Sequence, residues 1–366
     1  MPDVSTDLQF LSGIRVVDFT QFEAGPSCTE ALAWLGAEVV KIENPKTGDP
    51  GRRLRPGRPD DDPYYFQVFN ANKKSITVNL KAPRGLELVK DLLRKADVCV
   101  ENMAPGTIER LGLGYDVVRD LNPGIIYCQV KGFGTGMTMA ITILGALYRR
   151  AATGEGHRLQ VAMQDAMLHY MRTNFSTQAR TGKAVERDGT RSGGGSNAPS
   201  GLYPCAPGGA NDYVWIMTSR ANPEHWARLC KVMGREELIS DPRFTTPDER
   251  VKNNAVLDEI ITAWTKTRTK HEAMQQVGGA SIPAGAVLDT MELMNEKSFD
   301  ERGIMQVMEH PSYKPYKMPA WPVRIDGKPP KVKASPILGQ HTDEVLTNWL
   351  GISEAEVKSL HKDEVV

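Results

Sequence analysis

The alternation of strand-like and helix-like segments in its first half most restricts the fold of this chain. The segments "IRVVDF" (14–19), "EVVKIE" (38–43), "KSITVNL" (74–80) and "GIIYCQV" (124–130) are short apolar runs with many β-branched residues. Such runs are typical of buried strands. Between them lie segments such as "PRGLELVKDLLRKA" (83–96), whose apolar residues recur at helical spacing. This rhythm predicts an α/β fold, a parallel sheet covered by helices, with ligands bound where the strands end.

The second half of the chain has a different composition. The stretch 180–201 is rich in glycine, serine and charge, which predicts a linker or a working loop. A strand-like segment (212–219) and several amphipathic helices follow, and 327–336 is a proline-rich return segment. The predicted organisation is a large domain over 1–190, a glycine-rich loop and linker over 191–212, a small α/β domain over 213–325, and a return linker with C-terminal helices, packed on the large domain, over 326–366.

Charge and cysteine content exclude several classes of protein. Lys plus Arg and Asp plus Glu number 45 each, and a neutral balance argues against nucleic-acid or membrane partners. The longest apolar run, around 137–148, is too short to span a bilayer. The first ten residues show no basic region followed by an apolar one. The five cysteines form no CxxC pair. We therefore expect a cytoplasmic protein without a structural metal.

The only phosphate-binding pattern of interest is glycine-rich and has the wrong spacing. Gly132, Gly134 and Gly136 in "VKGFGTGM" form GxGxG rather than GxGxxG. They come late in the predicted sheet, and no acidic residue ends a later strand to contact a ribose. HExxH, GxxxxGK[ST] and GxSxG do not occur. A nucleotide-dependent oxidoreductase therefore remains only as an alternative function.

Several long segments point to a particular family. They span 11–52, 70–115, 145–167, 281–287 and 335–346, and include "GAEVVKIENPKTGDPGR", "KKSITVNLK", "VENMAPGTIERLGLGY" and "VAMQDAM". In this order they resemble the class III CoA-transferases, the family of formyl-CoA:oxalate and carnitine CoA-transferases. The resemblance implies a Rossmann-like large domain, a smaller α/β domain and a homodimer of interlinked chains. It implies two substrates, an acyl-CoA (a CoA thioester) and a small carboxylic acid. It implies no permanently bound cofactor.

The resemblance also implies that part of the chain is missing. In the family a further segment lies between the "KGFG" turn and the "GTGM" of the next helix, and it holds the nucleophilic Asp. Here Gly134 is followed directly by Thr135, and Lys131–Met137 contains no Asp or Glu. The catalytic residue is therefore unknown. Covalent catalysis requires a placed nucleophile, so we expect little or no CoA transfer. A non-catalytic CoA-binding dimer is an alternative. Asp165 belongs to a motif that the family carries beside its nucleophile.

The resemblance carries over several binding residues. Glu23 takes a substrate-pocket position that often holds Gln, and Asn44 a position where some relatives have Arg. Arg110 matches an arginine that meets nucleotide phosphates, which suits guanidinium geometry; a solvated helix charge is its alternative. Gly193, Gly194 and Gly195 resemble a mobile loop over the active site, with a flexible linker as their alternative. The remaining expected CoA contacts are Val78, Asn79, Leu80, Lys81, Asn102, Met103 and Ala104.

Overall fold

The computed structural model describes residues 10–54, 62–131, 134–187, 189–190, 197–311 and 313–366. Contacts divide the chain into two compact units, which are described separately below. The large unit is Met1–His169 with Glu296–Val366, and the small unit is Tyr170–Asn295. The finer division expected at residues 190, 212 and 325 stays a prediction.

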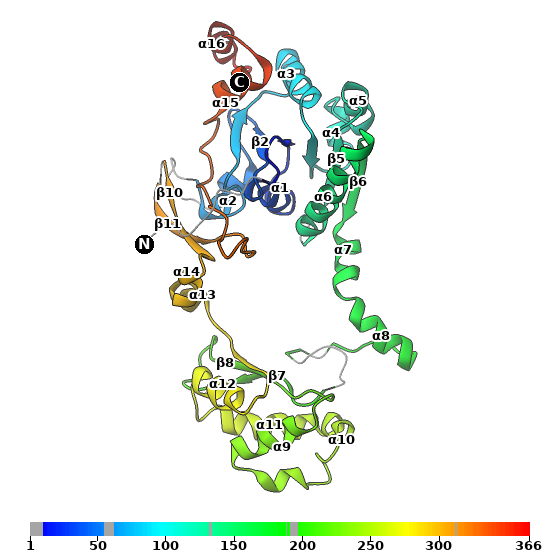
Figure 1. The fold of residues 1–366 in the computed structure, drawn as a ribbon, viewed down its shortest axis with the longest axis vertical. Coiled ribbons are helices and arrows are strands. Elements are labelled where there is room, and N and C mark those ends of the chain that lie inside the picture. The colour runs from blue at the N-terminus through cyan, green and yellow to red at the C-terminus, as the bar shows by residue number, and fades with distance from the viewer. Residues whose placement is uncertain (1–9, 55–61, 132–133, 188, 191–196, 312) are drawn as a thin grey trace. The chain divides into compact units, whose positions relative to one another are not determined.

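A six-stranded parallel sheet forms the centre of the large unit (Figure 1). Its strands, in spatial order, are β3 (Lys74–Thr77), β2 (Glu38–Glu43), β1 (Arg15–Asp18), β4 (Val98–Glu101), β5 (Ile126–Lys131) and β6 (His157–Ala162). The chain moves outward from β1 to β3, returns to pair β4 with β1, and then moves outward the other way. Strand order therefore reverses between β1 and β4, which is the point where open α/β sheets bind ligands. The predicted parallel sheet is confirmed.

Helices cover both faces of this sheet. On one face pack α1 (Ala24–Trp34) and α6 (Thr135–Thr153), and on the other α3 (Pro83–Arg94), α5 (Tyr115–Leu121) and α15 (Thr342–Leu350). Neighbouring residues of one strand enter opposite clusters: Val16 joins the first and Val17 the second, and neither is exposed. Strands buried on both faces lose the polar alternation of half-exposed ones. That is why the two valines of "IRVVDF" stand next to each other and do not alternate with polar residues.

The remaining elements of the large unit lie around the sheet. They are η1 (Pro50–Arg53), α2 (Tyr64–Gln67), α4 (Thr107–Arg110), α14 (Lys297–Glu301), the antiparallel pair β10 (Met305–His310) and β11 (Tyr313–Pro319), α16 (Glu354–Lys362), and α7 (Met163–Tyr170), which reaches the unit boundary. The C-terminal helices expected over 326–366 include α15, whose Val345, Leu346 and Trp349 are buried. Within the described ranges, no helix is both long and apolar enough to cross a membrane.

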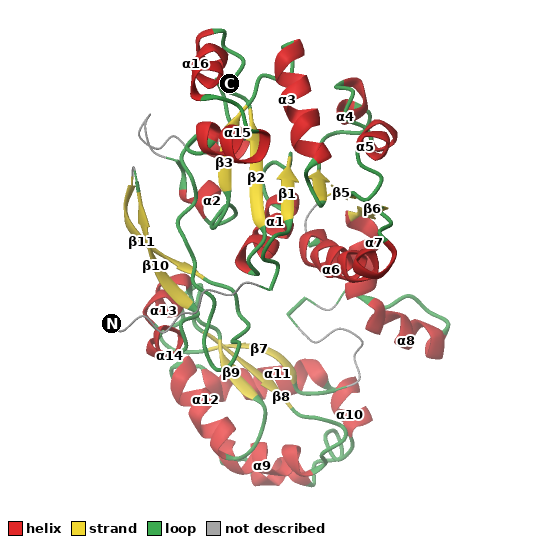
Figure 2. Ribbon diagram, turned by 45° about the horizontal axis from the view of Figure 1, so that its top comes forward, coloured by secondary structure: helices red, strands yellow, loops and turns green. Residues whose placement is uncertain are grey.

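The small unit has its own antiparallel sheet and its own core (Figure 2). The strands are β7 (Ser200–Pro204), β8 (Tyr213–Met217) and β9 (Ala284–Ala286), and the helices are α8 (Arg172–Thr181), α9 (Glu224–Met233), η2 (Glu236–Ile239), α10 (Pro247–Lys252), α11 (Asn254–Thr265), α12 (Lys270–Gly279) and α13 (Thr290–Asn295). Side chains of β8 (Val214, Ile216) pack with α9 and α11 (Trp226, Leu257, Ile261). The expected smaller domain of mixed helix and strand is therefore present.

Candidate functional site

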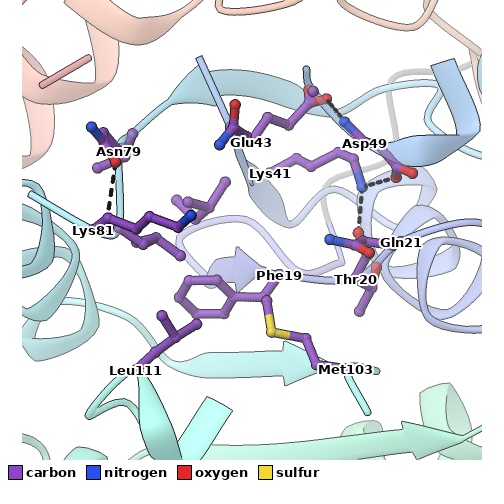
Figure 3. Close-up of a pocket in the computed structure, with 15 residues that line it drawn as sticks. Phe19, Thr20, Gln21, Lys41, Glu43, Asp49, Asn79, Lys81, Met103 and Leu111 are labelled. Carbon is purple, nitrogen blue, oxygen red and sulfur yellow. Dashed lines mark hydrogen bonds and ion pairs between the residues drawn. The ribbon is translucent and has the colours of Figure 1, made fainter. Parts of the chain in front are cut away.

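A cavity of about 170 Å³ lies at the carboxyl ends of β3, β2, β1 and β4, beside the reversal of strand order (Figure 3). We call it the strand-end pocket. Its lining residues mostly follow directly on those strands, and they are Phe19, Thr20, Gln21, Lys41, Ile42, Glu43, Asn44, Gly48, Asp49, Val78, Asn79, Leu80, Lys81, Met103 and Leu111. All of them belong to the large unit. The pocket thus occupies the place where a parallel sheet of this type holds its ligand.

Five of the predicted contacts line this pocket, namely Val78, Asn79, Leu80, Lys81 and Met103. Asn102 is not among the lining residues, and it joins the ends of β1 and β4. Its Oδ1 accepts from the Gln21 amide at 2.8 Å, and its Nδ2 donates to the Gln21 carbonyl at 2.7 Å. Asn102 therefore fixes the geometry of two strand ends.

The other predicted contacts do not line the pocket or lie outside the described residues. Glu23, Ala104 and Arg110 are not among the lining residues. Arg110 ends α4 and is exposed, and its guanidinium donates to Thr107 Oγ1 at 3.0 Å. The next residue, Leu111, lines the pocket, so α4 brings Arg110 to its neighbourhood. The predicted glycine loop 193–195 lies outside the described residues.

A buried ion pair forms one wall of the pocket. Lys41 Nζ lies 2.7 Å from Asp49 Oδ2 and donates to the Thr20 carbonyl at 2.6 Å (Figure 3). The side chains of Lys41 and Asp49 are each 1% exposed. Burial by itself would lower the pKa of Lys41, but Asp49 and the nearby Asp18 outweigh it and the pKa is raised. Lys41 is therefore a fixed, charged part of the wall.

Asp18, at the end of β1, holds a second buried cation. Its carboxylate accepts from the Thr20 amide at 2.8 Å and from Thr29 Oγ1 at 2.7 Å, and it lies 3.2 Å from Lys73 Nζ. Burial would raise the pKa of Asp18, but Lys73 and Lys41 overcome this effect, so the pKa is lowered. The side chains of Asp18 and Lys73 have no solvent exposure. Asp18 therefore stabilises the end of β1 and does not face a ligand.

The second acidic lining residue, Glu43, is also fully paired. It accepts from Arg52 Nε and Nη2 at 2.7 Å each and from Ser75 Oγ at 2.6 Å. Burial would raise the pKa of Glu43, yet Arg52 outweighs burial and the pKa is lowered. Within the described chain, the two carboxylates that line the pocket, Glu43 and Asp49, are both held by cations.

Several of these residues were not identified from the sequence alone, among them Phe19, Lys41, Asp49 and Leu111. A sign was present in "EVVKIE", where Lys41 and Glu43 interrupt an apolar strand. Charged side chains are rarely fully buried without a partner. The pattern indicates buried ion pairs but does not name the partners.

The start of α6 lies beside the start of α1. Gly134 precedes α6 with a left-handed φ of 75°, a conformation that glycine adopts without steric cost. Two residues on, a Cβ at Gly136 would lie 2.4 Å from Ser27 Oγ and 2.7 Å from the Ala24 carbonyl, so the first turns of α6 and α1 are in close contact. Glu23 directly precedes α1, and partial burial raises its pKa. Asp165 is exposed on α7 and is not a lining residue.

Comparisons with known proteins agree with this architecture. The sequence profile of CoA-transferase family III matches residues 11–136 and 134–342. The formyl-CoA:oxalate CoA-transferase of Streptomyces avermitilis is 35% identical over 411 residues, with 97% of this chain and 99% of the relative covered. The enzyme of the same name from Rhodopseudomonas palustris (strain CGA009) is 33% identical over 412 residues, covering 96% of each chain. A crystal structure of a CAIB/BAIF family protein from Brucella suis superposes with a TM-score of 0.79 at 26% identity, covering 94% of this chain and 100% of that one.

The two profile matches together take in most of the chain, and the two curated relatives align over nearly their whole length. These matches confirm the sequence resemblance, and the activity class of the family is that of a transferase. The chain belongs to CoA-transferase family III.

Proposed function

We propose that this chain binds an acyl-CoA in the strand-end pocket and lacks the carboxylate needed to transfer the CoA. The reaction at issue moves CoA from an acyl-CoA to a carboxylic acid, and the relatives' name supplies formyl-CoA and oxalate as candidates. CoA thioesters act as substrates, without a permanently bound cofactor. The observation that carries the proposal is the position of the pocket, where loop 78–81 meets the ends of β1 and β4.

The pocket combines the two properties that a CoA ligand requires. Phe19, Leu80, Met103 and Leu111 give it apolar walls, which suit an adenine ring or a pantetheine chain. Lys81 is exposed, and it has no ion-pair partner in the described part of the chain. Together with the exposed guanidinium of Arg110, it provides positive charge for phosphates.

Transfer by this family requires a covalent carboxylate. The carboxylate attacks the thioester carbonyl, expels the CoA thiolate and forms a mixed anhydride. The thiolate then attacks the enzyme carbonyl of that anhydride, which releases the donor acid and leaves an enzyme thioester. The acceptor acid attacks this thioester, expels the CoA thiolate and forms a second anhydride. The thiolate then attacks the acceptor carbonyl of that anhydride, which gives the acceptor's CoA thioester and regenerates the enzyme carboxylate. Each step depends on one placed carboxylate.

Three observations support the loss of that carboxylate. Lys131–Met137 contains no Asp or Glu. The alignment with the Streptomyces avermitilis relative extends over 411 residues, whereas this chain has 366, so at least 45 aligned positions have no counterpart here. The profile matches two ranges that overlap at residues 134–136. At this point Gly134 leads directly into α6. Glu43 and Asp49, both ion-paired, are poor substitutes.

CoA binding tests the first half of the proposal. Calorimetry should detect CoA binding that weakens as salt is added, because phosphate charge contributes to it. Arg110→Ala and Lys81→Ala should each weaken binding by about tenfold, the loss of one charge-assisted contact. Arg119→Ala is the matched control, since this exposed arginine on α5 pairs with Asp116 and Asp120. Unchanged affinity of Arg110→Ala would refute its assignment.

We also propose a homodimer, and the cytoplasm stays the predicted location. Large apolar side chains of α6 and α7 are exposed, with Ile141 at 70% and Tyr148 at 86%. Monomeric soluble proteins rarely expose many such side chains together, and a two-fold partner is the commonest cover. Light scattering should give about twice the chain mass of 40.4 kDa. A monomer across a wide concentration range would contradict the dimer.

A further inference from the structure

A second cavity, of about 460 Å³, adjoins the strand-end pocket and shares Asn44, Asn79 and Lys81 with it. Its other lining residues are Pro45, Lys46, His361, Glu364 and Val366. The two cavities are therefore neighbours, one at the strand ends and the other at the C-terminal turn (residues 363–366) that follows α16. A ligand that is long and charged at one end could occupy both.

The C-terminal turn is a fixed wall of this second cavity. The Asn79 amide donates to the Val365 carbonyl at 2.8 Å, which ties the turn to loop 78–81. Val365 and Val366 are 8% and 7% exposed and pack with Leu88 and Leu360. Burial of these side chains holds the turn against the large unit.

The loop that carries Lys46 is fixed by hydrogen bonds of its own. The Asn44 side chain accepts from the Lys46 amide at 2.9 Å and from the Thr47 amide at 3.1 Å, an Asx turn that fixes the loop. The Lys46 ammonium lies 3.2 Å from Glu364 Oε2, and these side chains are 76% and 74% exposed. An ion pair this exposed contributes little and exchanges easily.

The charged side chains at this cavity favour an anion. Lys46 and Lys81 place two ammonium groups among the lining side chains, against the single side-chain carboxylate of Glu364. The imidazole of His361 lies 2.6 Å from Asp343, so it already has an acidic partner. A phosphate group can carry more negative charge than one carboxylate, and it offers more acceptor oxygens.

We propose that Lys46, together with Lys81, binds a phosphate group at the nucleotide end of CoA, and that Glu364 competes for Lys46 when no ligand is bound. This inference rests on the proposed CoA-binding function. It adds a phosphate-binding lysine and a competing carboxylate from the C-terminal turn. Phosphate displaces Glu364 from Lys46, and both side chains are exposed enough to separate.

The test relies on opposite changes in CoA affinity when Lys46 and Glu364, which are in contact, are substituted one at a time. In calorimetry with CoA, Lys46→Ala should weaken binding by about three- to tenfold. Glu364→Gln should tighten it by about two- to fivefold, because the competing charge is removed. If the pair only fastened the turn to loop 44–46, both substitutions would weaken binding or neither would change it, and the inference would be overturned. Lys362→Ala, an exposed lysine of α16 outside the cavity lining, should leave affinity unchanged.

A second ligand identifies the phosphate. Dephospho-CoA lacks the ribose 3′-phosphate but keeps the diphosphate. If the effect of Lys46→Ala vanishes with dephospho-CoA, Lys46 binds the 3′-phosphate, and if it persists, Lys46 binds the diphosphate. CoA binding that Lys81→Ala weakens but Lys46→Ala does not would overturn this inference and leave the proposed function intact. No CoA binding by the unsubstituted chain would reject both.

Discussion

The unmodified chain should transfer no measurable CoA from formyl-CoA to oxalate, and insertion of the relatives' segment between Gly134 and Thr135 should restore transfer. Loss of a covalent nucleophile commonly costs roughly four to six orders of magnitude in rate, so the difference should be easy to measure by chromatography of the CoA esters. The matched control is the same insertion with its nucleophilic Asp replaced by Asn. That control should fold and dimerise like the repaired chain and remain inactive.

Trapping distinguishes a missing nucleophile from a replaced one. The unmodified chain is incubated with acyl-CoA and then with hydroxylamine or borohydride, and modified residues are located by mass spectrometry. We expect none. Modification of Asp165 or Glu23 together with turnover would reveal a substitute nucleophile and contradict the proposed loss. If the repaired dimer binds CoA but stays inactive, Glu23 and Asn44 are the first positions to restore to the relatives' residues.

Asp18→Asn should lower the free energy of unfolding by about 3–5 kcal/mol, the usual cost of removing one partner of a buried ion pair. The substitution would leave the ammonium of Lys73 buried without its carboxylate, because Asp18 and Lys73 have no exposed side-chain area. Urea denaturation at pH 7 measures the change. The control is Asp120→Asn, which removes an exposed partner of Arg119 and should cost less than about 1 kcal/mol. Equal losses in the two variants would contradict the buried-pair argument.

The same variant should alter the acid side of the stability profile. The pKa of Asp18 is lowered in the folded chain, with Lys73 and Lys41 overcoming the effect of burial. A carboxylate of this kind contributes fully above its unfolded pKa of about 3.9, and its contribution is lost as the pH falls through the folded value. The unsubstituted chain should therefore lose more stability than Asp18→Asn as the pH falls from 5 to about 2. Parallel profiles would show that Asp18 is not stabilised by its neighbours.

The sequence by itself determined the parallel sheet and the edge of the sheet at which the strand-end pocket lies. Both follow from local patterns, because apolar runs mark strands buried on two faces and the residues after each run must lie at one edge. The family resemblance assigned loop 78–81 and Met103 to CoA binding, and the strand pattern explains why they lie at one edge of the sheet. The sequence also determined that no carboxylate lies at the join between Lys131 and Met137, since this needs only the order of the residues.

Only the tertiary structure decided which partners complete the site. Lys73 meets Asp18 across 55 positions of sequence, and the Asn102 side chain meets the Gln21 backbone across 81. The Lys46 ammonium meets Glu364 across 318. No periodicity records such pairs, because they arise from strand order and from the return of the C-terminal turn to the sheet edge. A charged residue in an apolar strand indicates that it needs a partner. The identity of that partner depends on the packed core, which brings distant segments within hydrogen-bonding distance.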